Sequence, residues 1–314
     1  MTFAETAKWL RDRDDFIILT HVRPDGDTLC TAAALASGLR RLGKKAYLLP
    51  NEGATERYLD HMADFFAPEG YEYKNVVSVD TAGERMFPEN AKELINKVGL
   101  SIDHHHSNEF YAENTYVDGD RAACGEIVYE FIMELCGDIT PREAELLYIA
   151  VSTDTGCFAY ANTNADTFRV ASALVAAGAP NAKLNKKFFR TKSKNRIALD
   201  GSIISGIRFF HDGQTAVATV TIKMLEDTGA TENDLDDIAN IPGQIEGVKC
   251  SITVRELADG RSKASLRTTG EVNASDVCAV FGGGGHPMAA GCTLEADTVT
   301  AGEMIAAEIG KCLK

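Results

Sequence analysis

Acidic and histidine residues recur in four short segments of the sequence, and together they could bind metal ions. The segments are HVRPDGD at 21–27, VVSVD at 76–80, SIDHH at 101–105 and STDTG at 152–156. Carboxylate and imidazole groups suit Mn²⁺, Fe²⁺ or Mg²⁺, and Zn²⁺ is also compatible with them. The candidate residues are His21, Asp25, Asp27, Asp80, Asp103, His104, His105 and Asp154.

So many carboxylates cannot all stay ionised at close range unless positive charge compensates them. Five or six ligands exceed the needs of one ion. Two divalent cations about 3.5–4 Å apart, bridged by one carboxylate, would use them all. Such a pair activates water and stabilises an in-line displacement at phosphorus, so the pattern predicts phosphoester hydrolysis.

Each segment also has an ordinary structural interpretation. Asp25 and Asp27 flank a glycine in a good turn sequence, Asp80 could cap a helix, and the three histidines at 104–106 could lie in a solvated loop. The joint pattern favours a site, because five of the seven histidines fall in three candidate motifs: His21, 104–106 and His286.

The elements that would position these residues are short apolar runs alternating with helical patterns. We expect strands at 16–19, 46–49, 76–79 and 100–102, and helices at 27–42, 123–135, 143–152 and 165–177. This alternation predicts an α/β domain with a mainly parallel sheet flanked by helices. Parallel sheets bind ligands at the carboxyl ends of their strands. Most of the candidate metal-binding residues come directly after a predicted strand, at this end.

The second half of the chain has a different character. Alternating patterns at 206–222 and 247–268 suggest antiparallel strands, and helices are expected at 273–281 and 300–314. We therefore predict a catalytic domain at 1–186, a linker at 187–195 and a smaller α+β domain at 196–314, with a cleft between the domains. The linker contains a basic segment, KKFFRTKSKNR, which is either a solvated linker face or a strip beside an anionic substrate.

Length and composition narrow the possible functions. The chain has 314 residues and a formal net charge of −14, which argues against binding long duplex nucleic acid by counterion release. There is no apolar run near the ~20 residues that span a membrane and no secretory signal, so a cytoplasmic location is expected. The eight cysteines form no CxxC pair and are expected to be reduced, mostly buried residues.

The four segments, in this order, resemble the motifs of the DHH phosphoesterase superfamily, named for the triplet seen here as Asp103-His104-His105. The segment FGGGGHPMAAG at 281–291 resembles the DHHA1 substrate-binding domain. The resemblance covers essentially the whole chain, and its length and two domains are similar to the group of bifunctional oligoribonucleases and pAp phosphatases called nanoRNases.

The resemblance implies specific roles. One metal would be held by His21, Asp25 and Asp80, and the other by Asp27, Asp80, His104 and Asp154. Asp80 would bridge the two ions, Asp103 would orient a histidine, and His105 would contact the scissile phosphate or protonate the leaving group. The family usually has a glycine where this chain has Cys30, and a small cysteine can fit there.

The glycine run before His286 offers backbone freedom and bare N–H groups, as an anion-binding nest requires; the alternative is a flexible loop. By resemblance, Gly283, Gly284, Gly285 and His286 would hold a terminal phosphate or base. Arg267 would bind a phosphate, since a guanidinium donates two parallel hydrogen bonds. Arg255 and Arg190 are weaker candidates.

The expected activity is therefore hydrolysis of short single-stranded oligonucleotides, and of the 3′-phosphate of pAp, with two divalent ions, which we expect to be Mn²⁺. Hydrolysis of cyclic dinucleotides or their linear products, such as pApA, is the first alternative. A family II pyrophosphatase and a nucleotide sensor without catalysis are less favoured. The protein could be a homodimer.

Overall fold

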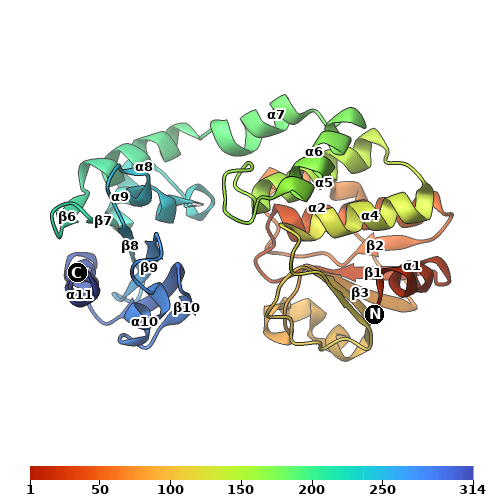
Figure 1. Cartoon of the computed structure of the whole chain (residues 1–314), viewed down its shortest axis with the longest axis horizontal. Helices are drawn as coiled ribbons and strands as arrows, with labels where there is room; N and C mark the ends of the chain where they lie inside the picture. Colours follow the sequence, from red (N-terminus) through yellow and green to blue (C-terminus); the bar gives the residue numbers. More distant parts are fainter. Residues whose placement is uncertain (236, 314) are drawn as a thin grey trace. The chain divides into compact units, whose positions relative to one another are not determined.

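The chain forms two compact units. The computed structural model describes residues 1–235 and 237–313, and the chain divides into Met1–Thr191 (unit 1) and Lys192–Lys314 (unit 2) (Figure 1). The division falls within the predicted linker, 187–195. That segment is largely helical, because a π-helix covers Lys186–Arg190 and helix α8 begins at Lys194.

Unit 1 is built on a five-stranded sheet in which every neighbouring pair is parallel, as predicted. The strands, in the spatial order β2-β1-β3-β4-β5, are β1 (Phe16–Leu19), β2 (Ala46–Leu48), β3 (Asn75–Val79), β4 (Val98–Asp103) and β5 (Thr115–Val117). The short edge strand β5 was not predicted.

Helices surround this sheet (Figure 1). The α-helices of unit 1 are α1 (Phe3–Arg11), α2 (Gly26–Arg41), α3 (Glu56–Leu59), α4 (Cys124–Cys136), α5 (Pro141–Asp154), α6 (Ala165–Ala176) and α7 (Asn181–Asn185). Short 3₁₀ helices cover Ala63–Phe65, Glu84–Met86 and Glu89–Lys97. All four helices predicted in this half are present; α1, α3 and α7 are additional.

Both faces of the sheet are buried. Successive side chains of a strand point to opposite sides of the sheet, so one strand contributes to the core on each face. Phe16 and Ile18 of β1 enter the core beneath α2, α4 and α5. Ile17 and Leu19 enter a smaller core on the other face, which the 3₁₀ helix Glu89–Lys97 covers. Uninterrupted apolar strands are expected of a parallel sheet covered on both sides.

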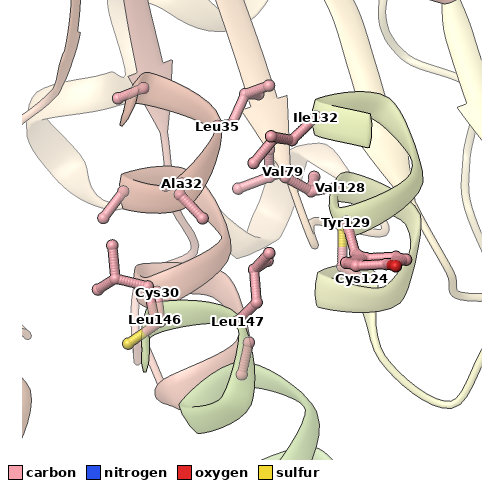
Figure 2. Close-up of a cluster of buried hydrophobic side chains, with 14 of the residues drawn as sticks. Cys30, Ala32, Leu35, Val79, Cys124, Val128, Tyr129, Ile132, Leu146 and Leu147 are labelled. Atoms are coloured by element: carbon pink, nitrogen blue, oxygen red, sulfur yellow. The ribbon is translucent and has the colours of Figure 1, made fainter. Parts of the chain in front are cut away.

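The two helices that carry candidate ligands begin at strong capping residues. Asp25 precedes α2 and accepts hydrogen bonds from the amides of Asp27 and Thr28. Thr140 precedes α5 in a capping box with Glu143. Figure 2 shows part of the core between these helices, with Leu35 of α2 beside Val79 of β3 and Val128 of α4.

Unit 2 is an α+β unit with a six-stranded sheet in the order β10-β11-β9-β8-β7-β6. The strands are β6 (Arg208–Phe210), β7 (Thr215–Val220), β8 (Cys250–Glu256), β9 (Ser262–Thr268), β10 (Gly284–His286) and β11 (Ala289–Leu294). The helices are α8 (Lys194–Ser205), α9 (Ile222–Thr228), α10 (Ala274–Ala279) and α11 (Thr298–Cys312), with 3₁₀ helices at Glu232–Asp234, Ile238–Asn240 and Pro242–Gln244.

Two details of unit 2 differ from expectation. The sheet is mixed, because β7 and β8 pair in parallel while the other pairs are antiparallel. Alternation along a strand shows which residues face the core but not the direction of the neighbouring strand. The last two glycines of the run also belong to a strand, β10, which was not predicted.

The eight cysteines form no disulfide bonds, as expected. Five of them are buried: Cys30, Cys124, Cys250, Cys278 and Cys292. Over the described ranges, no helix combines the length and the apolar character needed to cross a membrane.

Candidate metal centre and substrate-binding residues

The carboxyl ends of three central strands bring the candidate ligands of unit 1 together. His21 lies two residues after β1, Asp80 directly after β3 and His104 directly after β4, and Asp154 is the last residue of α5. Three groups of side chains have ligand atoms within 4.8 Å of one another: His21 with Asp25 and Asp80, Asp27 with His104 and Asp154, and Asp80 with His104 and His105.

The first group lies on one side of Asp80. The Nε2 atom of His21 is 3.8 Å from Oδ1 of Asp25 and 3.8 Å from Oδ2 of Asp80. Burial opposes ionisation of Asp25, but His21 and the two capping amides outweigh it and hold the pKa of Asp25 below its usual value. Asp25 is therefore an ionised carboxylate at neutral pH.

The second group lies on the other side of Asp80. The Nε2 atom of His104 is 3.3 Å from Oδ1 of Asp80, 3.7 Å from Oδ2 of Asp154 and 3.9 Å from Oδ2 of Asp27. The two oxygens of Asp80 thus face different ligand groups. A carboxylate in this position has the geometry of a bridging ligand.

Asp80 is the least compensated of these acids. The residue is 3% exposed, and its Oδ1 atom makes no hydrogen bond to any described residue. Burial, together with the neighbouring Asp27, raises the pKa of Asp80 well above its usual value, and the same two causes raise the pKa of Asp154 to about 7. Asp80 also has φ of 53°, in the left-handed region, which aspartate adopts more readily than most other residues.

The orientation of His104 leaves a ligand atom aimed at these acids. Its Nδ1 atom lies 3.1 Å from the carbonyl oxygen of Arg121. A carbonyl can only accept a hydrogen bond, so Nδ1 carries the proton and is the donor. In the neutral ring, Nε2 then presents a lone pair toward three carboxylates. Burial lowers the pKa of His104, but the neighbouring carboxylates of Asp80, Asp27 and Asp154 raise it to about 10.

This arrangement fits divalent cations. Without a cation, a proton must occupy the space between His104 Nε2 and the carboxylates. A metal ion would replace the proton, supply a partner for Oδ1 of Asp80 and neutralise the buried acids. The carbonyl of Arg121 would hold the imidazole in the ligating tautomer, as outer partners of metal-bound histidines usually do.

Asp27 also ties α2 to α4. Its Oδ1 atom accepts from the hydroxyl of Thr31 at 2.9 Å and from the amide of Gly125 at 2.9 Å, and its Oδ2 atom accepts from the amide of Cys124 at 2.6 Å. Gly125 allows this approach, since a Cβ atom there would lie 2.8 Å from Cβ of Ala150. The first turn of α4 therefore fixes the carboxylate.

Asp103 lies behind His105. Its Oδ1 atom is 2.8 Å from Nδ1 of His105, and its Oδ2 atom accepts from Nδ2 of Asn108 at 2.6 Å. Burial opposes ionisation of Asp103, but these partners lower its pKa below the usual value. With Nδ1 occupied by Asp103, the partly exposed His105 ring has Nε2 available for a substrate. Asp103 contacts the ring of His105 and only the backbone amide of His104.

Unit 2 brings together the remaining predicted residues. His286 of β10 is opposite Ala289 of β11, and Ala289 is opposite Arg267 of β9. Directly opposed residues share a face of a sheet, so Arg267 and His286 lie on one face with a small alanine between them. Within the described ranges, the Arg267 guanidinium forms no ion pair, and it donates a hydrogen bond to the carbonyl of Leu266 at 3.2 Å.

The glycines of this run have structural reasons of their own. A Cβ atom at Gly283 would collide with the backbone of Gly291, and one at Gly285 would lie 2.6 Å from the carbonyl oxygen of Ala289. The Gly283 amide donates to the carbonyl of Cys278 at 2.9 Å, so it is not one of the bare amides that a nest would need. Gly284 and Gly285 pair with β11.

Sequence reasoning missed several residues that support the centre: Asn108, Thr31, and the backbone groups of Arg121, Cys124 and Gly125. Three of the five act through the main chain, which leaves no trace in side-chain type. Asn108 lies only three residues after His105, but nothing in the sequence distinguishes it from a loop asparagine.

Comparison with known proteins places this geometry in a family. Residues 15–151 match the DHH family, N-terminal domain, and residues 212–311 match the DHHA1 domain. The chain is 32% identical over 286 residues to the "Bifunctional oligoribonuclease and PAP phosphatase NrnA" of Thermus thermophilus, covering 88% of this chain and 83% of that protein.

Solved structures agree on the fold. The chain is similar to an exopolyphosphatase-related protein from Bacteroides fragilis, with a TM-score of 0.87 at 24% identity, over 98% of this chain and 95% of that one. It is also similar to RecJ from Thermus thermophilus, solved in complex with Mn²⁺, with a TM-score of 0.57 at 15% identity, over 98% of this chain and 55% of that one. The ligand geometry and these matches lead to one conclusion: the chain belongs to the DHH family of phosphoesterases, with a DHH domain followed by a DHHA1 domain.

Proposed function

We propose that this protein hydrolyses short single-stranded oligonucleotides to mononucleotides and removes the 3′-phosphate of pAp, using two Mn²⁺ ions. The observation that carries the proposal is the position of Asp80 between two ligand groups, with one carboxylate oxygen toward His21 and the other toward His104. The substrate class comes from the similarity to the oligoribonuclease and PAP phosphatase of Thermus thermophilus.

In this proposal, His21, Asp25 and Asp80 hold one ion, and Asp27, Asp80, His104 and Asp154 hold the other. The pair of cations supplies Lewis acidity at the phosphoryl group and lowers the pKa of an attacking water. Asp80 would serve both positions, and a cation would give its buried Oδ1 atom the partner that it lacks among the described residues.

The protein's own residues would do the rest. Asp103 fixes Nδ1 of His105, so Nε2 of that ring contacts the scissile phosphate or gives a proton to the leaving oxygen. Arg121, through its carbonyl, fixes the His104 tautomer. In unit 2, Arg267 and His286 lie on one face of the sheet and would bind a terminal phosphate or base, assisted by Gly284 and Gly285 and less directly by Gly283.

A substrate panel tests this proposal. Di- to pentanucleotides, pAp, pApA, cyclic di-AMP and pyrophosphate are each incubated with Mn²⁺ and the wild-type protein or a variant. We expect mononucleotides from the oligonucleotides and inorganic phosphate from pAp. Asp80→Asn should abolish all of these activities, and His286→Ala and Arg267→Ala should weaken the oligonucleotide reactions most.

Asn90→Ala is the matched control, because Asn90 is an exposed residue whose side chain bonds only the Pro50 carbonyl. Full activity of Asp80→Asn would refute the two-metal assignment. Faster hydrolysis of pyrophosphate or cyclic di-AMP than of any dinucleotide would refute the substrate assignment while leaving the metal centre intact.

A further inference from the structure

The chain that follows Asp154 adopts an unusual backbone conformation beside the candidate metal centre. Gly156, Cys157 and Phe158 have φ of 55°, 59° and 67°. Side chains other than glycine rarely adopt this left-handed region, and a bulky residue such as phenylalanine does so least readily. Three such residues in succession reverse the chain directly after α5.

Hydrogen bonds hold the reversed segment against the ligand-bearing end of α5. The hydroxyl of Thr155 accepts from the amide of Phe158 at 3.1 Å, and the carbonyl of Thr155 accepts from the amide of Tyr160 at 3.0 Å. The side chain of Asn162 donates to the carbonyl of Asp154 at 3.1 Å. The position of Tyr160 is therefore fixed relative to Asp154.

The ring of Tyr160 lies over Gly156. A Cβ atom at Gly156 would collide with the ring carbons Cε1, Cζ and Cε2, so the ring contacts the glycine backbone itself. The side chain nevertheless remains 50% exposed. The ring of Tyr160 therefore lies against the backbone of Gly156, and half of the residue's surface is accessible to solvent.

The ring is close to the centre along the chain. Gly156 is two residues from Asp154, and consecutive Cα atoms are 3.8 Å apart, so the two Cα atoms are separated by at most about 7.6 Å. A base joined through its sugar to a phosphate at the metal centre would extend over a comparable distance.

We propose that the Tyr160 ring is a stacking surface for a nucleobase of the substrate, adjacent to the scissile phosphate; this inference rests on the proposed function. Every base has a planar π-face, so stacking on an aromatic side chain binds nucleotides without reading their sequence. Metal ions held by these ligands would bind only the phosphate group, and many compounds that contain no base also have a phosphate. The ring gives unit 1 a preference for nucleotides over phosphate compounds that lack a base.

The test compares substrates within each variant. Hydrolysis of pApA with Mn²⁺ is compared with hydrolysis of two abasic analogues, each lacking one of the two bases. The variants are Tyr160→Leu, which keeps an apolar side chain over Gly156, and Tyr160→Phe, which keeps the ring. Phe209→Leu is the matched control, because Phe209 of β6 is a similarly exposed ring, at 53%.

For the wild type, Tyr160→Phe and Phe209→Leu, removing the stacked base should lower kcat/KM about 5- to 150-fold. For Tyr160→Leu, removing that base should change kcat/KM less than twofold. The ratio of kcat/KM for pApA to kcat/KM for the abasic analogue is measured within one variant. A general loss of metal binding or stability lowers both values and leaves the ratio unchanged.

Equal base dependence in Tyr160→Leu and the wild type would overturn the stacking surface and leave the proposed function standing. If the wild type cleaves no dinucleotide, the proposed function fails instead. Binding of a dinucleotide containing 2-aminopurine then decides the inference, because stacking quenches its fluorescence. Quenching that Tyr160→Phe keeps and Tyr160→Leu loses supports the surface, and quenching unaffected by either variant excludes it.

Discussion

Asn108 offers a direct test of how the centre is supported from behind. Its side chain is 6% exposed, and its Nδ2 atom donates to Oδ2 of Asp103 at 2.6 Å. Its Oδ1 atom accepts from the amide of Phe110 at 2.8 Å. Replacing Asn108 with alanine removes one of the partners that keep Asp103 ionised and leaves a buried carboxylate oxygen without a donor.

The expected loss follows from the strength of these bonds. A hydrogen bond to a charged group contributes about 1.5–3 kcal/mol, so Asn108→Ala should lower the free energy of unfolding of unit 1 by about that amount. With an m-value of about 2–3 kcal/mol/M in urea, the unfolding midpoint should fall by about 0.5–1.5 M.

The chain contains a convenient probe. Trp9 is the only tryptophan, and it is buried in the core of unit 1, so its fluorescence in a urea titration follows unit 1. Asn90→Ala, at an exposed site, should change the free energy of unfolding by less than about 0.5 kcal/mol. Asn108→Asp should be worse than alanine at pH 7, because it places a second carboxylate against Asp103, and should improve as the pH falls and one of the pair becomes protonated.

An Asn108→Ala midpoint within error of the wild type would refute this reasoning, since it would mean that water replaces the amide without cost. The same conclusion would follow if Asn108→Asp were as stable as the wild type at pH 7. Either result would show that Asp103 does not depend on its buried partner.

Three further predictions use the same fluorescence assay. Mn²⁺ at a hundred times its dissociation constant should stabilise wild-type unit 1 by about 2.7 kcal/mol, and EDTA or Asp80→Asn should remove this gain; an equal gain in Asp80→Asn would contradict the site. Burial raises the pKa of Glu126, which is fully buried in the first turn of α4. The folded state therefore loses stability as the pH rises above 4.5, and Glu126→Gln should stabilise by about 1 kcal/mol at pH 8 and less at pH 5. Gly125→Ala should weaken Mn²⁺ binding, because its Cβ would press on Ala150 and shift the amide that holds Asp27. Gly201→Ala, in an open helical position, should not affect Mn²⁺ binding.

The ligand-bearing part of the fold could be predicted because its signals are local. β1 is an uninterrupted apolar run, β3 and β4 are mostly apolar, and a histidine or aspartate follows each strand within two residues. The rule that parallel strands place their carboxyl ends together then brought distant segments to one site. β5 gave no such signal, since Thr115–Val117 is short and only partly buried.

The remaining features depend on contacts between distant segments. The bonds from the amides of Cys124 and Gly125 to Asp27 join elements that are far apart in the sequence, so nothing local indicates the contact. The register that places Arg267 and His286 on one face of unit 2 is fixed by β11 between them. Residue types identified these two as candidates, and only the strand pairing shows that they lie together.

Cys30 belongs to one of the sequence motifs but lies in the core and is not among the candidate metal ligands. The family pattern usually has glycine at this position, for close helix packing, yet Cys30 is fully buried in α2, beside Leu146 of α5 (Figure 2). The close approaches occur elsewhere: a Cβ atom at Gly26 would collide with Thr153, and one at Gly38 would lie 2.9 Å from Ile132. Because Gly26 directly precedes Asp27, the close approach of α2 to α5 beside the candidate metal centre occurs at Gly26. A small side chain at position 30 therefore fills the core without moving the ligands.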